Sequence, residues 1–150
     1  MSKFIYRMQN ILNIKYKLED QAKTEFMLAN QVLREEEGKL ETLELRKKGY
    51  EDAVRNLLQN QLQVDRIKEN QEAIVRMEEF IRAQIIKVEE AARQVEIKAA
   101  KLTELMQERK AQEKLKEKAF EAFLQEENAK ESKEIDELVS FTYGRKQREE

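Results

Sequence analysis

The sequence predicts an all-α protein that folds as a long antiparallel two-helix coiled-coil hairpin. Three observations support this prediction. Charged residues make up 40% of the chain, well above the about 25% of an ordinary globular domain. The chain has no proline and three glycines, so few residues interrupt a helix. Apolar residues recur at alternating steps of three and four in two long stretches, and this rhythm loses phase between Leu58 and Asn70.

The length of 150 residues fits a single coiled-coil domain. We expect a first arm over about residues 3–60, a bend over about 60–70 and a second arm over about 71–128. A C-terminal helix and tail over 129–150 should overhang. The bend contains no glycine, proline or Asn-Gly pair, so it is predicted from phase and polarity alone.

In the first arm, the apolar stripe predicts which residues face the second arm. The steps alternate except at Leu18, Ala22 and Phe26, where two steps of four adjoin and predict a stutter in the supercoil. The N-terminal tip is broader and more apolar than a strict seam, which suits contact with a third surface. The predicted seam positions are Phe4, Met8, Ile11, Lys15, Leu18, Ala22, Phe26, Ala29, Leu33, Glu36, Leu40, Leu43, Lys47, Tyr50, Val54, Leu57, Gln61 and Val64.

The second arm has a matching stripe with one further double step of four, between Met77 and Ile85. Folding back at about residue 65 should bring Tyr50 near Phe80 and Phe4 near Glu126. The predicted seam positions of this arm are Ile74, Met77, Ile81, Ile85, Val88, Ala92, Val95, Ala99, Leu102 and Met106.

The predicted register leaves Lys130–Glu150 with nothing opposite. An isolated helix of about 12–15 residues is marginal in water, so we expect this segment to fray alone and to become buried on a partner. The alternative is that it folds back onto the apolar tip Phe4–Leu12. The residues that keep helical spacing here are Ile135, Leu138, Val139 and Thr142 or Phe141.

The three glycines have different predicted roles. Gly38 and Gly49 lie inside the first arm, where each marks either a close approach of another backbone or a tolerated exposed position. Gly144 is predicted to end the last helix as a left-handed cap.

Composition argues against catalysis, so we expect no enzyme, cofactor, metal site or small-molecule substrate. The chain has no histidine, no cysteine and no glycine-rich phosphate loop. Its paired carboxylates lie in charged helical runs, where solvent keeps their acidity ordinary.

Lys and Arg total 29 against 31 Asp and Glu, so no net positive field predicts nucleic acid as a partner. The N-terminus lacks the apolar run of a signal peptide, and the sequence has no stretch of roughly 18 uncharged apolar residues. We therefore expect a cytoplasmic protein that acts through contacts.

Several segments together resemble the FliJ family of flagellar type III export proteins. They are the opening FIYRMQNILNIKYKLEDQAKTEF, the central Leu43, Tyr50 and Phe80-Ile81, the run ERKAQEKLKEK and the C-terminal EIDEL. The resemblance extends over the whole chain, and the order and spacing of the segments make it more specific than any one of them.

The resemblance implies a stalk-like coiled coil that binds the centre of the hexameric flagellar export ATPase. Such proteins also contact the cytoplasmic part of the export-gate membrane protein and escort export chaperones. It implies a cytoplasmic protein peripherally associated with the inner face of the cell membrane at the flagellar base.

The resemblance also implies two contact sets. Leu43, Tyr50 and Phe80 match the residues that contact the gate, whereas Arg46 and Gln84 replace an aromatic and an aliphatic residue of the family pattern. The residues expected to contact the ATPase are Phe4, Met8, Ile11, Ile135, Leu138 and Val139.

Two other functions compete with the stalk. A holdase chaperone would grip unfolded export substrates between apolar arm ends, and a plain coiled-coil spacer or scaffold would need no specific partner. Stimulation of a hexameric ATPase at substoichiometric amounts favours the stalk, and suppression of client aggregation favours the holdase.

Overall fold

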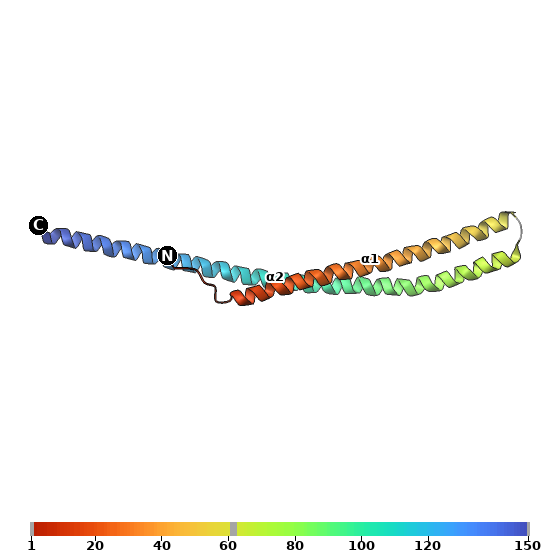
Figure 1. Cartoon of the computed structure of the whole chain (residues 1–150), viewed down its shortest axis with the longest axis horizontal. Helices are drawn as coiled ribbons and strands as arrows, with labels where there is room; N and C mark the ends of the chain where they lie inside the picture. The colour runs from red at the N-terminus through yellow and green to blue at the C-terminus, as the bar shows by residue number, and fades with distance from the viewer. Residues whose placement is uncertain (1, 61–62, 150) are drawn as a thin grey trace. The chain divides into compact units, whose positions relative to one another are not determined.

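Two α-helices make up almost all of the chain (Figure 1). The computed structural model describes residues 2–60 and 63–149. Helix α1 spans Gln9–Asn60 with 52 residues, and helix α2 spans Val64–Glu149 with 86 residues. The helices pack against each other antiparallel, and no strand occurs among the described residues. The predicted all-α helical hairpin is therefore confirmed.

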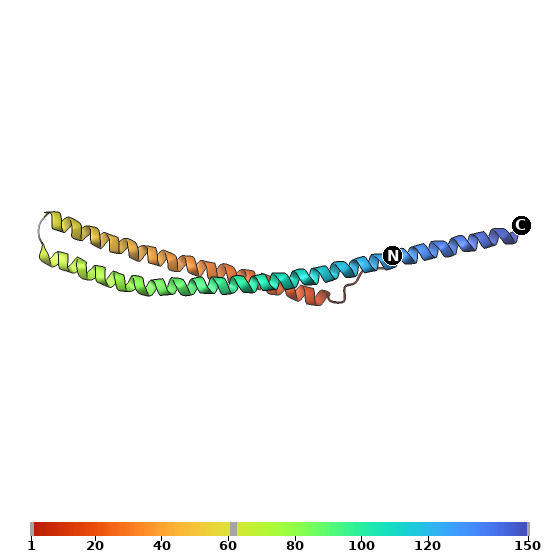
Figure 2. The same cartoon turned by 180° about the vertical axis from the view of Figure 1, so that it is seen from behind.

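The chain divides into two compact units. The hairpin unit is Asp20–Glu104, in which most of α1 lies beside the first part of α2 in both views (Figures 1 and 2). The terminal unit is Met1–Glu19 with Leu105–Glu150, and it joins the N-terminal segment and the start of α1 to the rest of α2.

In the hairpin unit, the seam of α1 follows the predicted stripe. Every predicted position from Ala22 to Leu57 is buried or half-buried. On α2, the buried positions include Gln84 and Ala91, whereas Ile85 is 39% exposed. The predicted double step of four after Met77 is therefore wrong, because polar Gln84 takes the seam position next to apolar Ile85.

In the terminal unit, the start of α1 shows the same kind of shift. Leu12 and Glu19 are 1% and 3% exposed, whereas Ile11 and Leu18 are 40% and 38% exposed. The predicted stutter at Leu18 is wrong, because Glu19 is the seam residue. The spacing of three and four then runs without a break along α1.

The N-terminal segment is not helical before Gln9, so the predicted helical phase of Phe4 and Met8 is wrong. The Phe4 ring instead packs edge-on against Phe120, with centroids 5.2 Å apart, and lies 5.4 Å from the Phe123 ring. Phe4 thus lies beside the part of α2 that the register predicts, although its ring contacts are Phe120 and Phe123 and not Glu126. Aromatic burial positions this segment without a helix.

The connection between the helices is shorter than the predicted bend. Since α1 ends at Asn60 and α2 begins at Val64, most of the predicted bend is helical. Gln61 and Leu62, which belong to the predicted bend, lie outside the described residues.

At the other end, α2 runs through Gly144 to Glu149. The described chain has no glycine with positive φ, so the predicted left-handed cap at Gly144 is wrong. With no proline and one glycine in its C-terminal half, α2 meets no residue that ends it earlier.

Candidate interaction surfaces

The seam of the hairpin unit contains a buried polar contact between the helices. The Gln84 amide donates to the Glu36 carboxylate and, at 2.9 Å, to the Glu36 backbone carbonyl. The hydrogen bond from Gln84 lowers the pKa of the Glu36 carboxyl below its ordinary value. Gln84 is therefore a seam residue.

Leu43 lies beside this contact. A shallow groove is lined by Leu43, Arg46 and Gln84, together with Glu35, Gly38, Lys39 and Thr42. Leu43 itself is half-buried. Arg46 and Gln84 thus lie next to Leu43, one of the predicted gate-contact residues.

The two predicted aromatic gate-contact residues differ in exposure. Tyr50 is half-buried on the α1 seam, whereas Phe80 is 54% exposed on α2. The exposure of Phe80 confirms the prediction that it points partly outward. A large exposed aromatic side chain on a charged helix is typical of a contact residue.

In the terminal unit, an ion pair missed by the sequence reasoning joins the two helices. Arg109 donates to both carboxylate oxygens of Glu19, at 2.6 and 3.1 Å, and to Glu113 at 3.2 Å. Glu19 is almost fully buried. A bidentate pair of this kind satisfies a carboxylate that would otherwise be costly to bury.

A second polar contact lies near this pair. The Tyr16 hydroxyl donates to Glu113 at 2.6 Å. This hydrogen bond raises the pKa of Tyr16 and lowers that of Glu113, because it stabilises the neutral phenol and the charged carboxylate. A groove lined by Phe4, Leu12, Tyr16, Glu113, Lys116, Glu117 and Phe120 opens beside it.

The N-terminal residues predicted to contact the ATPase differ in their surroundings. Phe4 is half-buried in the aromatic cluster, whereas Met8 and Ile11 are each 40% exposed. Phe4 therefore contributes to the terminal unit itself, and Met8 and Ile11 present apolar surface to solvent.

The C-terminal residues predicted to contact the ATPase lie on an uncovered part of α2. All described side chains from 128 to 143 are exposed, so the alternative in which this segment folds back onto Phe4–Leu12 is not observed. We call the following residues the tail stripe: Ile135, Leu138, Val139, Phe141 and Tyr143, which are between 60% and 72% exposed. Tyr143 was not among the residues predicted from the sequence.

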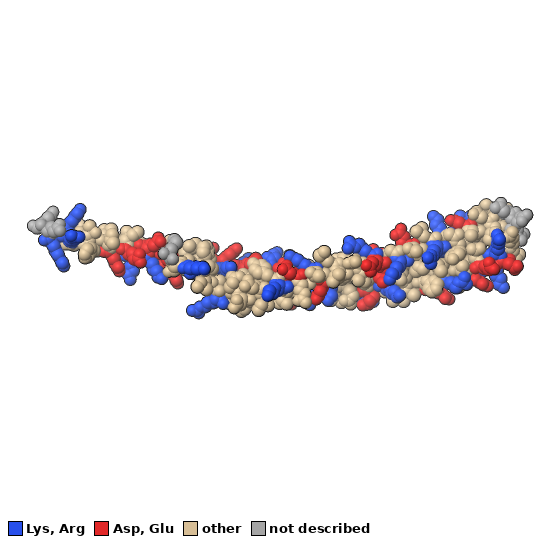
Figure 3. Space-filling model, in the orientation of Figure 1, with Lys and Arg blue, Asp and Glu red and all other residues tan. Residues whose placement is uncertain are grey.

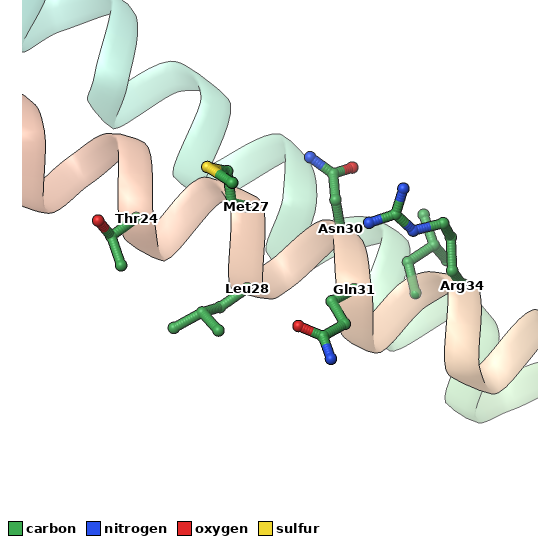
Figure 4. A pocket seen from close by; sticks show the side chains of 7 residues that line it. Thr24, Met27, Leu28, Asn30, Gln31 and Arg34 are labelled. Carbon is green, nitrogen blue, oxygen red and sulfur yellow. The ribbon is translucent and has the colours of Figure 1, made fainter.

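A further exposed apolar patch lies on α1 in the hairpin unit (Figure 4). Met27 and Leu28 are 68% and 55% exposed and border a groove with Thr24, Asn30, Gln31, Leu33 and Arg34. The close-up shows Leu28 and Met27 projecting from the helix on different sides. No sequence motif marked this patch.

The structure offers no centre for metal chemistry within the part of the chain that it describes. No group of three or more His, Cys, Asp or Glu side chains could hold an ion there. Every buried side-chain polar atom of the described residues has a hydrogen-bond partner. In the same residues, neither helix is long and apolar enough to cross a membrane.

Comparison with known families decides the identity of the chain. A family model described as flagellar FliJ protein matches residues 3–148. The chain belongs to the FliJ family. The predicted family is thereby confirmed, and this FliJ-family protein is a component of flagellar type III protein export.

One solved structure shares the fold of this FliJ-family chain. It is a Chlamydia trachomatis protein described as a YscO homologue, with 21% sequence identity and a TM-score of 0.75. The match covers 99% of this chain and 100% of that one. No curated protein matches the chain.

Proposed function

We propose that the chain is a non-enzymatic, stalk-like coiled coil that binds the hexameric flagellar export ATPase and links it to the cytoplasmic part of the export-gate membrane protein. The FliJ-family match and the helical hairpin support this proposal. The chain would not hydrolyse ATP, and it would alter turnover by binding the states of the ring with different affinity.

The uncovered tail stripe is the observation that most supports ATPase binding. Ile135, Leu138 and Val139 are at least 60% exposed on a helix that has no covering segment in the described terminal unit. Large apolar side chains that share a helical face are stabilised by burial on a partner. Met8 and Ile11 add exposed apolar surface in the same unit.

The gate contact is proposed for Leu43, Tyr50 and Phe80. Support comes from the match to the family pattern and from the exposure of Phe80. Because Gln84 is engaged with Glu36, we propose that Leu43 and Arg46 provide the accessible part of this groove.

Chaperone escort and peripheral association with the membrane at the flagellar base complete the proposal. Both rest on the family resemblance. The patch at Met27 and Leu28 offers apolar area that could take an export chaperone without using the tail stripe or the gate-contact residues.

The test is ATP hydrolysis by the purified hexameric ATPase with substoichiometric amounts of the chain. We expect stimulation by the full chain and little or none by a chain that lacks Lys130–Glu150. The truncated chain should melt almost as the full one, since the described side chains from 130 to 143 are exposed. Equal stimulation by both chains would contradict the proposed role of the tail stripe.

The many exposed apolar residues also favour the holdase as a second candidate. A holdase would suppress aggregation of an unfolded export substrate at equimolar amounts and would leave ATP hydrolysis unchanged. Measuring both activities on one preparation separates the two functions.

A further inference from the structure

The C-terminal part of α2 has a charge pattern that is complementary to itself when reversed. Six exposed residues recur at alternating steps of three and four and so share one face of the helix. In chain order they are two acidic, two apolar and two basic residues: Glu131, Glu134, Leu138, Phe141, Arg145 and Arg148. We call this set the tail row.

Figure 3 shows the same arrangement in space. Acidic side chains lie on one side of an uncharged patch of the tail, and basic side chains lie on its C-terminal side. Leu138 and Phe141, at the centre of the tail row, are 70% and 72% exposed. They are among the most exposed large apolar residues of the described chain.

We propose that two copies of this chain pair through their tail rows in an antiparallel arrangement. The row is symmetric about its midpoint, so reversing one copy brings Leu138 against Phe141 of the other. The same register places Glu134 opposite Arg145 and Glu131 opposite Arg148. Each contact then occurs twice, as a two-fold interface requires.

Coiled-coil geometry favours this register. In an antiparallel pair of helices, residues on the facing seam meet across the interface in reversed order, and opposite charges determine orientation. A parallel pair would place the acidic residues of both copies together and the basic residues together, which costs free energy. The charge pattern therefore favours the antiparallel orientation of two copies.

The size of the surface limits the strength of the pairing. About five turns of one helix bury less than the about 800 Å² per partner of a standard interface. We therefore expect a reversible dimer that forms at micromolar or higher concentration. Pairing would also stabilise a helical segment that is marginal when isolated.

This inference goes beyond the proposed function, because it needs no ATPase. It has a consequence for that function, since the dimer covers Leu138 and other parts of the tail stripe. Binding to a second copy and binding to the ATPase would then exclude each other.

The test is sedimentation of the full chain over a concentration series, with two charge-reversal variants. One carries Glu131→Lys and Glu134→Lys, and the other carries Arg145→Glu and Arg148→Glu. Each variant alone should have a dimer dissociation constant raised by at least about tenfold, because like charges then meet. An equimolar mixture should form heterodimers about as tight as the wild-type dimer, because opposite charges meet again.

Two controls keep the test specific. Lys133→Glu with Asp136→Lys preserves net charge and lies outside the tail row, so dimerisation should not change. Leu138→Ser should abolish dimerisation while circular dichroism of the hairpin stays the same. A wild-type chain that remains monomeric at near-millimolar concentration would overturn the proposal. So would equal dimerisation of the charge variants, or a mixture that fails to restore pairing.

Discussion

Phe80 and Tyr50 are aromatic residues with different surroundings, although the resemblance assigns both to the gate contact. Phe80 is 54% exposed, and Tyr50 is half-buried on the α1 seam. Removing an exposed ring changes folding free energy little, whereas removing a seam ring leaves unfilled volume between the helices.

We therefore expect Phe80→Ala to change the free energy of unfolding by less than about 0.5 kcal/mol and to weaken binding to the cytoplasmic part of the gate protein. Tyr50→Ala should lower both stability and binding. Ile97→Ala, which removes another exposed side chain of α2, should change neither. Thermal melts and binding titrations check this, and a large loss of stability in Phe80→Ala would assign that ring to the core.

The contact between Gln84 and Glu36 predicts a pH dependence. The pKa of the Glu36 carboxyl is lowered in the folded chain, mainly by the hydrogen bond from Gln84. A carboxyl group whose pKa is lower in the folded chain stabilises the fold at pH values above its unfolded-state pKa of about 4.3. This stabilisation is lost as the pH falls through the pKa of the folded state.

The variant Gln84→Met removes the donor while keeping similar volume. The difference in Tm between wild type and Gln84→Met should therefore move in favour of the variant as pH falls from 7 toward 3. The measurement is a set of thermal melts over this range. A difference that stays constant with pH would show that Gln84 does not stabilise the charged form of Glu36.

At the scale of the helices, Gly38 and Gly49 have low helix propensity and lie inside α1 without a visible structural role. Apart from its chain neighbours and the backbone of its own helix turn, a Cβ atom added at either position would meet no atom within 4 Å. Neither glycine has positive φ. The described chain therefore does not support the alternative in which another backbone approaches these glycines closely.

We expect Gly38→Ala to stabilise the chain by about 1 kcal/mol, because alanine has the higher helix propensity. The corresponding rise in Tm is about 2–4 °C for a chain of this size. Gly49→Ala should act in the same direction and serves as the matched variant. Destabilisation by either change would show that a partner needs the glycine.

The helices also show how much of the fold the sequence could predict. Hydrophobic periodicity predicted two antiparallel helices, because most seam positions are apolar. It misplaced Glu19 and Gln84, because a polar residue on the seam cannot be distinguished from a solvated one by hydropathy. Apolar Leu18 and Ile85 lie next to these positions, so the predicted stripe shifted by one residue onto them.

The candidate sites were predicted unevenly for physical reasons. The sequence predicted most of the tail stripe because an exposed apolar face of a helix has the same residue spacing as a buried one. Phe4 fitted a helical phase but packs on Phe120 from a segment that is not helical, because long-range aromatic contacts outweigh local periodicity. The patch at Met27 and Leu28 was missed, because exposure of two apolar residues next to a seam requires the structure.

At the scale of the whole molecule, the antiparallel hairpin can be tested by a single covalent link. Glu36 and Gln84 touch across the two helices, so Glu36→Cys with Gln84→Cys should form an intramolecular disulfide in this cysteine-free chain. Glu36→Cys with Ile86→Cys is the control, because Ile86 is 64% exposed. Disulfides that form only between chains would contradict the hairpin.

The central claim is that the tail stripe is uncovered in the isolated chain and becomes buried on the export ATPase. Amide hydrogen exchange across residues 135–143 tests it most directly, at a concentration where sedimentation shows only monomer. We expect fast exchange in the isolated chain and clear slowing when the hexameric ATPase is added, with the amides around Gln84 unchanged. Slow exchange before the ATPase is added, or no slowing once it is bound, would contradict the claim.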